Sequence, residues 1–394
     1  MLLVILLFWI SFSLLFFCYA GYGILLFGLN RIKNLFKKKK SQQSFINPPV
    51  TIIIAAFNEK AVLEQKIRNT LAIDYPPDLL TIIFITDGSS DGSDEIVRKN
   101  PRITLLHQPQ RQGKLAALKR AMQFVQTDIV VFSDANTMLN TGCIKKIVAH
   151  YNDDKVGGVA GEKKIAKQLQ ISPVGEAEGL YWQYESFLKQ QDSDFYTVVG
   201  AAGELFSIRT SLFRQTEDNI ILDDFIISMN VCLDGYKIKY EPEAFAVELP
   251  SASLTEEGKR KVRISAGAYQ SIGFLKECLN FFRHPLLSFQ YICRRLLRWI
   301  VCPPMLVILL ITNFIIVYQQ PGASFYEWTL YAQLVFYFLA IPGWWLIYSG
   351  KSAGWLTIPF YFVFMNYCLI KGFIRFKQGR YSVLWEKSLR QVVE

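Results

Sequence analysis

Histidine is scarce in this sequence, and its cysteines never occur in close pairs. The 394 residues include three His and seven Cys, and no two Cys have the spacing of a CxxC motif. His107, His150 and His284 also lack the spacing of metal ligands, so each is expected to be structural. The odd number and the scatter of the cysteines argue against a disulfide framework and favour a reducing compartment for the soluble part.

Charge is missing from residues 1–30. The stretch 2–29 is long enough to cross a bilayer, and no basic residue precedes it. A cleaved signal peptide would have a basic start and a shorter apolar core. We therefore expect an uncleaved anchor, with the basic cluster 37–40 and the domain that follows it in the cytoplasm.

Three further apolar stretches lie at about 300–318, 328–348 and 355–374, with Trp and Tyr at their ends as in an aromatic belt. Residues 275–299 mix apolar, aromatic and basic side chains, which is typical of helices in the membrane interface. Three crossings after the domain would place residues 371–390 outside, whereas the six basic residues there indicate the inside. The sequence does not decide between these two orientations.

The formal net charge of +10 comes mostly from basic residues beside the apolar stretches, among them Arg294, Arg295 and Arg298. That placement fits anionic lipid headgroups. It gives little support to nucleic acid as a partner, so membrane lipids are expected and nucleic acid is not.

The middle of the chain, about 48–273, has an ordinary globular composition. Four apolar runs of strand length alternate with helical patterns within about 90 residues. Such β-α repeats, joined by right-handed crossovers, predict a parallel, doubly wound sheet. The predicted strands are 50–56, 81–86, 103–106 and 128–133.

Three of these four strands end in loops that carry Asn, Asp or Glu: Asn58 and Glu59, Asp87 and Asp91, and Asp134 and Asn136. In open α/β sheets, ligands bind at the carboxyl edge, where such loops meet. Asp134 is therefore a candidate for holding a metal ion or a charged ligand. The alternative is a polar turn in which Asp134 caps the next helix.

The second half of the domain adds three more patterns. Residues 197–209 form a predicted strand of small residues that lets a ligand, or a packed element, approach the backbone closely. Asp223 and Asp224 follow an apolar run at the start of a predicted helix, 225–234, where they complement the helix dipole or supply a general base. The predicted helix 256–268 carries basic residues that suit a phosphate or a solvated face: Arg260, Lys261 and Arg263.

Together these motifs resemble the membrane-embedded inverting glycosyltransferases of family 2, the relatives of cellulose, hyaluronan, chitin-oligosaccharide and poly-N-acetylglucosamine synthases. The resemblance covers about 48–298, with the motifs in family order. It implies a GT-A-like doubly wound, mainly parallel α/β sheet in the cytoplasm, with one N-terminal and about three C-terminal transmembrane helices and interface helices. The implied parts are an anchor (1–30), a basic linker (31–48), the catalytic domain (49–273), interface helices (274–299), transmembrane helices (300–376) and a basic tail (377–394).

The donor site is implied by four matches. AAFNE resembles the family's first-strand motif, TDGSSDGS its nucleotide loop, QGK its G-K element, and RKVRI stands in place of Q-x-x-R-W. In the family these segments contact the uracil side and the diphosphate of the donor. The nucleotide-sugar-binding residues implied in this way are Ala55, Phe57, Glu59, Asp87, Lys114, Asp134 and Arg263.

SDAN stands where the family has D-x-D, which implies metal binding by Asp134 and Asn136. The metal should be Mg²⁺ or Mn²⁺ because the available ligands are oxygens. Asn136 replaces the second acid of the family motif. Arg260 and Ile264 replace the Gln and Trp of Q-x-x-R-W, which are associated with holding a growing polymer.

LDD matches the T/E-E-D motif, so the resemblance makes Asp224 the catalytic base beside Asp223. VVGAAGELFSIR resembles the segment that lines the acceptor site, which implies contacts from Gly200, Ala201, Ala202 and Gly203.

The implied enzyme is a metal-dependent hexosyltransferase of the bacterial inner membrane, moving a hexose or N-acetylhexosamine from a UDP-sugar to a saccharide acceptor in exopolysaccharide synthesis. Non-processive transfer to a lipid-linked acceptor remains open, as does an inactive transport or scaffold protein.

Overall fold

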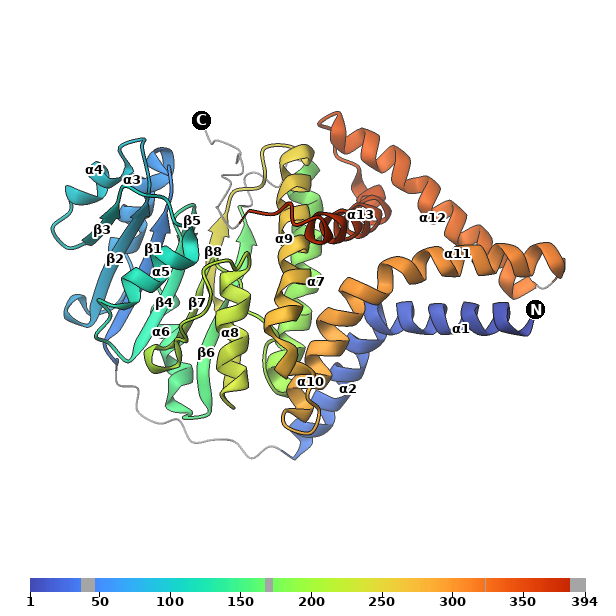
Figure 1. Ribbon diagram of the computed structural model, residues 1–394, viewed down its shortest axis with the longest axis horizontal. Coiled ribbons are helices and arrows are strands. Elements are labelled where there is room, and N and C mark those ends of the chain that lie inside the picture. Colours follow the sequence, from blue (N-terminus) through green and yellow to red (C-terminus); the bar gives the residue numbers. More distant parts are fainter. Residues whose placement is uncertain (37–46, 167–172, 323, 383–394) are drawn as a thin grey trace.

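The computed structural model describes all residues except 37–46, 167–172, 323 and 383–394. A twisted sheet with helices on both faces forms one part, and three helices extend away from it (Figure 1): α1 (Leu2–Phe16), α11 (Cys302–Gln319) and α12 (Ser324–Tyr348). The basic cluster 37–40 and the end of the basic tail, from which the orientation was predicted, lie outside the described residues.

In the part of the chain that the structure describes, the sheet has eight strands in the order β3-β2-β1-β4-β7-β6-β8-β5. Strands β1 to β4 pair in parallel, β6 is parallel to β8, and antiparallel pairing occurs at β7 and β5. The prediction of a mainly parallel sheet is confirmed. The strands are β1 (Val50–Ala56), β2 (Leu80–Asp87), β3 (Thr104–Gln108), β4 (Ile129–Asp134), β5 (Thr137–Leu139), β6 (Val156–Ile165), β7 (Phe206–Arg209) and β8 (Lys237–Glu248).

Helices cover both faces because alternate residues of the buried strands point to opposite sides. In β1, Ile53 and Ala55 pack with α5 and α8, whereas Ile52 and Ile54 pack with α3 and α6. The helices of this part are α3 (Lys60–Leu71), α4 (Ser93–Arg98), α5 (Lys114–Met122), α6 (Cys143–Val148), α7 (Pro173–Phe195), α8 (Asp223–Leu233) and α9 (Leu254–Phe274). Short 3-10 turns are η2 (Pro77–Leu79), η3 (Ala149–Asn152), η5 (Thr210–Leu212) and η6 (Lys276–Leu279).

The predicted strand 197–209 is wrong over most of its length, because only Phe206–Arg209 is extended within the sheet. Strand β7 runs antiparallel to β4, and Phe206 pairs with Phe132. The residues just before β7 therefore lie in a loop at the carboxyl edge of β4. Strand β8 continues through Pro242, where its pairing with β6 has a register shift.

Among the described residues, four helical runs are long and apolar enough to cross a membrane, in agreement with the predicted number. Residues 285–299, expected as separate interface helices, continue directly into the next apolar helix as the run Pro285–Gln319. The elements are α1 (Leu2–Phe16), η1 (Phe17–Gly21), α2 (Tyr22–Leu35), α10 (Pro285–Tyr291), η7 (Ile292–Val301), α11 (Cys302–Gln319), α12 (Ser324–Tyr348), η8 (Gly354–Leu356) and α13 (Thr357–Lys377).

Helix α13 packs lengthwise against α9. Near its start the Tyr361 hydroxyl donates to Glu257 Oε1 at 3.2 Å, and near its end Phe373 stacks edge-on against Tyr269, with ring centroids 5.2 Å apart. Between them Gly372 lies against Ser265, where an added Cβ would come within 2.3 Å of the Ser265 Cβ. The last apolar helix is therefore docked on the sheet-bearing part of the chain.

The arginines of η7 bind α7, which corrects their predicted role at lipid headgroups. Arg294 is buried, with Nη2 2.7 Å from Glu185 Oε2 and Nε 3.1 Å from Asp192 Oδ2. Arg298 Nη1 lies 2.7 Å from Glu185 Oε1. Buried carboxylates need a cationic partner, so these ion pairs fix the apolar helices to the sheet.

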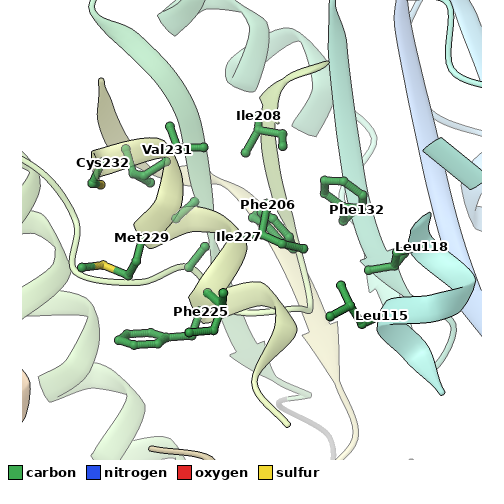
Figure 2. Packing of buried hydrophobic residues seen from close by; sticks show 14 of the residues in the cluster. Leu115, Leu118, Phe132, Phe206, Ile208, Phe225, Ile227, Met229, Val231 and Cys232 are labelled. Carbon is green, nitrogen blue, oxygen red and sulfur yellow. The ribbon is translucent and has the colours of Figure 1, made fainter. Parts of the chain in front are cut away.

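Phe206 and Phe132 are stacked in the core with ring centroids 4.8 Å apart, between α8 and α5 (Figure 2). We predict that Phe206→Ala lowers the free energy of unfolding by about 3–5 kcal/mol, because it removes a buried ring and leaves a cavity. Phe124→Ala removes an exposed ring and should change it little. Denaturant unfolding of the purified protein measures both, and equal losses would contradict the assigned packing.

Candidate functional site

Three elements bring charged side chains together at the carboxyl edge of the sheet. Lys114 begins α5, Asp134 ends β4, and Asp223 begins α8. The Lys114 Nζ atom lies 2.6 Å from Asp134 Oδ1 and 3.8 Å from Asp223 Oδ2. Strands β1 and β4 pair in parallel with Ala55 opposite Asp134, so the end of β4 lies at the carboxyl edge of the sheet.

Two glycines of the loop before β7 leave room, one for the charged cluster and one for the Phe225 ring of α8. An added Cβ on Gly203 would lie 2.8 Å from Lys114 Nζ and 3.3 Å from Asp224 Oδ2. Gly200 has a φ of +85°, and a Cβ there would come within 2.1 Å of the Phe225 ring. The small residues thus let the loop lie directly over the charged side chains.

The electrostatics of the cluster raise the pKa of one carboxyl group, that of Asp224. Burial, together with the neighbouring Asp223 carboxylate, raises the pKa of Asp224 to about 7. Although burial alone would lower the pKa of Lys114, the carboxylates of Asp134, Asp223 and Asp224 raise it above its usual value. An ammonium group therefore stands beside a carboxyl group that can take up a proton near neutral pH.

A cavity of about 310 Å³ contains most of the predicted site residues. Its lining also includes residues that the motifs did not single out, such as Trp182, Lys189 and Arg295. The predicted residues that line it are Glu59, Lys114, Asp134, Asn136, Gly200, Ala201, Ala202, Gly203, Asp223, Asp224 and Arg263.

Ala55, Phe57 and Asp87 do not line this cavity. Ala55 is buried within β1. The Arg111 guanidinium lies over the Phe57 ring, 3.7 Å from its centroid. The Asp87 carboxylate accepts from the backbone N–H of Gly113 at 2.6 Å, so in this structure it holds the loop that leads to Lys114.

Asp134 and Asn136 each offer side-chain oxygen atoms as possible ligands of a cation. Among the described residues, no three His, Cys, Asp or Glu side chains are grouped as a metal site. Asn136 Nδ2 lies 3.5 Å from Glu248 Oε1. Mg²⁺ is commonly bound through one or two carboxylates and substrate phosphates, so Asp134 and Asn136 fit a divalent cation that is shared with a phosphate ligand.

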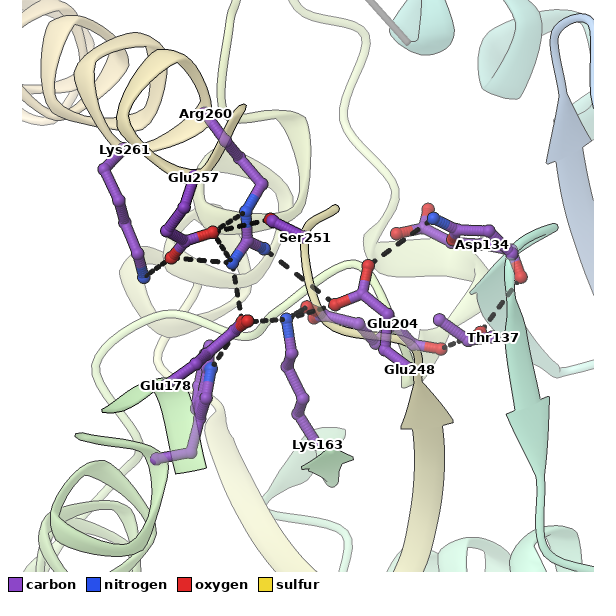
Figure 3. A network of polar contacts seen from close by, with 12 residues as sticks. Asp134, Thr137, Lys163, Glu178, Glu204, Glu248, Ser251, Glu257, Arg260 and Lys261 are labelled. Carbon is purple, nitrogen blue, oxygen red and sulfur yellow. Dashed lines mark hydrogen bonds and ion pairs between the residues drawn. The ribbon is translucent and has the colours of Figure 1, made fainter. Parts of the chain in front are cut away.

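A buried ion-pair network beside the cavity was missed by the motif analysis (Figure 3). Lys163 of β6 pairs with Glu178, Glu204 and Glu248, which come from α7, the glycine loop and the end of β8. Although burial opposes it, the Lys163 ammonium lowers the pKa of Glu204 to about 2. No local pattern joins these four residues, since they meet only in the fold.

The network also changes the prediction for the basic residues of α9. Arg260 Nη2 lies 2.6 Å from Glu178 Oε1 and 2.9 Å from Glu257 Oε2, and Lys261 Nζ lies 3.5 Å from Glu257 Oε1. These carboxylates, rather than a phosphate, are the partners of Arg260 and Lys261 in the structure. Arg263 also lines the cavity, and its role as a phosphate ligand stays a prediction.

Residues 51–216 match the sequence model described as Glycosyl transferase family 2. We refer to the sheet-bearing part of the chain, which contains this segment, as the family 2 domain. Residues of the poly-beta-1,6-N-acetyl-D-glucosamine synthases of Staphylococcus aureus (strain COL) and Staphylococcus epidermidis are 27% and 24% identical to this chain over 234 residues. Each match covers 56% of this chain and 55% of the relative, so the chain spans about half the length of these relatives.

The family 2 domain and the apolar helices also resemble one solved structure as a whole. A mannosyltransferase from Pyrobaculum calidifontis, in complex with GDP-Man and Mn²⁺, has a TM-score of 0.69 with 20% sequence identity. The match covers 95% of this chain and 99% of that one. The fold is therefore a GT-A type domain joined to membrane-type helices.

The closeness of Gly203 to Lys114 gives a test of the site. We predict that Gly203→Ala weakens binding of a sugar nucleotide roughly tenfold or more, because the new Cβ pushes the Lys114 ammonium away from Asp134. Gly142→Ala is a matched control, since a Cβ there meets nothing within 4 Å. Calorimetric titration measures both, and unchanged binding by Gly203→Ala would show that this loop does not shape the site.

Proposed function

We propose that the protein is a membrane-bound inverting hexosyltransferase. It transfers a hexose or N-acetylhexosamine from a UDP-sugar to a saccharide acceptor, in exopolysaccharide synthesis. The observation that carries the proposal is the meeting of Lys114, Asp134, Asp223 and Asp224 in one cavity of the family 2 domain. The similarity to poly-N-acetylglucosamine synthases supports the choice of donor and pathway.

Asp224 is the proposed catalytic base. As the acceptor hydroxyl attacks the anomeric carbon, its proton must leave, and a carboxylate with a pKa of about 7 is suited to accept it. Asp223 keeps that pKa raised by its adjacent charge. Direct displacement of the diphosphate then inverts the anomeric configuration.

The leaving diphosphate gains negative charge as its bond to the sugar breaks. Lys114 and Arg263, which line the cavity, are the proposed cationic groups that stabilise this charge. Asp134 and Asn136 would hold Mg²⁺ or Mn²⁺, which supplies further charge neutralisation when bound. Phe57, Glu59, Asp87 and Ala55 belong to the proposed nucleotide end of the donor site, and residues 200–203 to the acceptor side.

The proposed setting is a bacterial inner membrane, with the catalytic domain in the cytoplasm. The four apolar helical runs support a membrane protein. The competing reading, an inactive transport or scaffold protein, differs in one measurable respect, because it would release no UDP from any donor.

Asp224→Asn tests the proposed base. We predict that the purified protein releases UDP from one member of a panel of UDP-sugars in the presence of Mn²⁺, and that Asp224→Asn lowers this rate by roughly 10²-fold or more. Asp218→Asn, which changes an exposed acid that pairs with Lys119, should keep the rate. A coupled UDP assay measures both. Absence of UDP release from every donor would favour the scaffold reading.

Removal of divalent metal tests the cation proposed at Asp134. Excess chelator should abolish UDP release, and Mn²⁺ or Mg²⁺ should restore it, because the diphosphate would otherwise leave without its counter-ion. The comparison of the two metals identifies the preferred one. Full activity after chelation and dialysis would show that Lys114 and Arg263 suffice.

A further inference from the structure

The side chain of Lys66, in α3, is completely buried, with an exposed fraction of 0%. Its neighbours on the buried face of α3 are Leu63 and Ile67, which pack in the hydrophobic core. Burying an ammonium group costs free energy, and replacement of a buried charge by an apolar side chain is often neutral or stabilising. Packing alone therefore does not account for a lysine at this position.

The Lys66 ammonium is bound to the turn that follows β4. Its Nζ atom donates to Ser133 Oγ and to the Thr137 carbonyl oxygen, each at 2.8 Å. Ser133 and Thr137 flank the segment that contains Asp134 and Asn136. Helix α3 thus holds both ends of the turn 133–137, which carries the two proposed cation ligands.

The same hydrogen bonds continue into the glycine loop. The Ser133 hydroxyl donates to the Glu204 carbonyl oxygen at 3.0 Å. The Thr137 hydroxyl donates to the Asp134 carbonyl oxygen at 3.0 Å, within the turn itself (Figure 3). Glu204 directly follows Gly203, which lies over the charged cluster. A displacement of Ser133 would therefore be transmitted to the cation ligands and to the loop above them.

The turn 133–137 has little negative charge for binding a divalent cation. Asp134 is its one carboxylate, since Asn136 has a neutral amide. The affinity of a protein site for such a cation depends on the charge of its ligands and on the rigidity of the site. Removal of groups that orient the ligands typically lowers metal affinity by about 10- to 100-fold. A turn with a single acid is therefore expected to depend strongly on the groups that fix its geometry.

We propose that Lys66 is a positioning residue for the divalent cation. Its hydrogen bonds to the turn 133–137 hold Asp134 and Asn136 where both can contact a cation that is shared with the donor diphosphate. Lys66 is not one of the described residues that line the cavity, so it acts through the turn and not on the substrate. The inference rests on the proposed function and adds a residue that the motifs did not single out.

Calorimetric titration of the full chain with UDP, in phosphatidylcholine nanodiscs, tests this role. In the unchanged protein Mn²⁺ should tighten UDP binding relative to excess chelator, because the turn and the diphosphate share the cation. Lys66→Met keeps a long, unbranched side chain but removes the hydrogen bonds, so it should reduce this tightening roughly tenfold. UDP binding in chelator should stay as it is. A role in folding alone would lower the amount of folded protein and leave the ratio of the two dissociation constants unchanged.

Thr70→Val is the matched control. Thr70 is equally buried on the same face of α3, and its hydroxyl donates to the Lys66 carbonyl oxygen at 2.8 Å. This variant removes a buried hydrogen bond within α3 and should keep the effect of Mn²⁺. Ser133→Ala removes one partner of the Lys66 ammonium and should reduce the effect of Mn²⁺ in the same direction as Lys66→Met. It keeps the test decisive if Lys66→Met does not fold.

The outcomes separate this proposal from the proposed function. UDP release that requires Mn²⁺, together with an undiminished effect of Mn²⁺ on UDP binding in Lys66→Met and Ser133→Ala, would overturn only the role of Lys66. A diminished effect in both variants, without UDP release from any donor, would support that role and overturn the transferase. UDP binding that Mn²⁺ does not tighten in the unchanged protein would also overturn the role of Lys66.

Discussion

The ion pair between Lys114 and Asp134 is the contact on which the candidate site depends. Without a cation at this point, Asp134, Asp223 and Asp224 would repel one another within a largely buried cavity. Asp87 fixes the loop that leads to Lys114, and the missing side chain of Gly203 gives the ammonium its space. A donor diphosphate entering the cavity would compete with these carboxylates for the Lys114 ammonium. Binding of the diphosphate would therefore change the partners of Lys114.

A buried ion-pair network positions the elements around the contact between Lys114 and Asp134. Lys163 joins β6 to α7, β8 and the glycine loop, and Arg260 joins α9 to α7. These ion pairs are buried, so removal of a single partner leaves an uncompensated charge and is more damaging than loss of a surface pair. The network holds α9, and with it Arg263, at a fixed distance from the sheet edge. Buried ion pairs thus set the distance between α7 and α9, which bound one side of the cavity.

The sequence was sufficient for the features that depend on local pattern. Apolar runs predicted β1, β2 and β4, and the parallel topology then brought Asp134 to the carboxyl edge beside Lys114. The sequence was insufficient where a side chain binds a partner that is distant in the sequence. Arg294 follows the pattern of a headgroup-binding residue, yet its partners Glu185 and Asp192 lie about a hundred residues earlier on α7. Glu248 and Lys163 belong to no motif, and only the fold shows that they meet.

The docking of α13 on α9 has a consequence for the path of the chain through a membrane. Ser352, just before α13, donates to Glu176 Oε2 of α7 at 2.7 Å, so the chain has returned to the side of the family 2 domain by that point. The apolar runs Leu2–Leu35, before the domain, and Pro285–Gln319 and Ser324–Tyr348, after it, are long enough to cross a membrane, and one crossing by each would agree with this return. Helix α13 then runs along α9, which carries Glu257 and Lys261. If α13 remains beside the domain in a membrane, Lys371 and Arg375 lie on the domain's side of it, where the distribution of positive charge would place them.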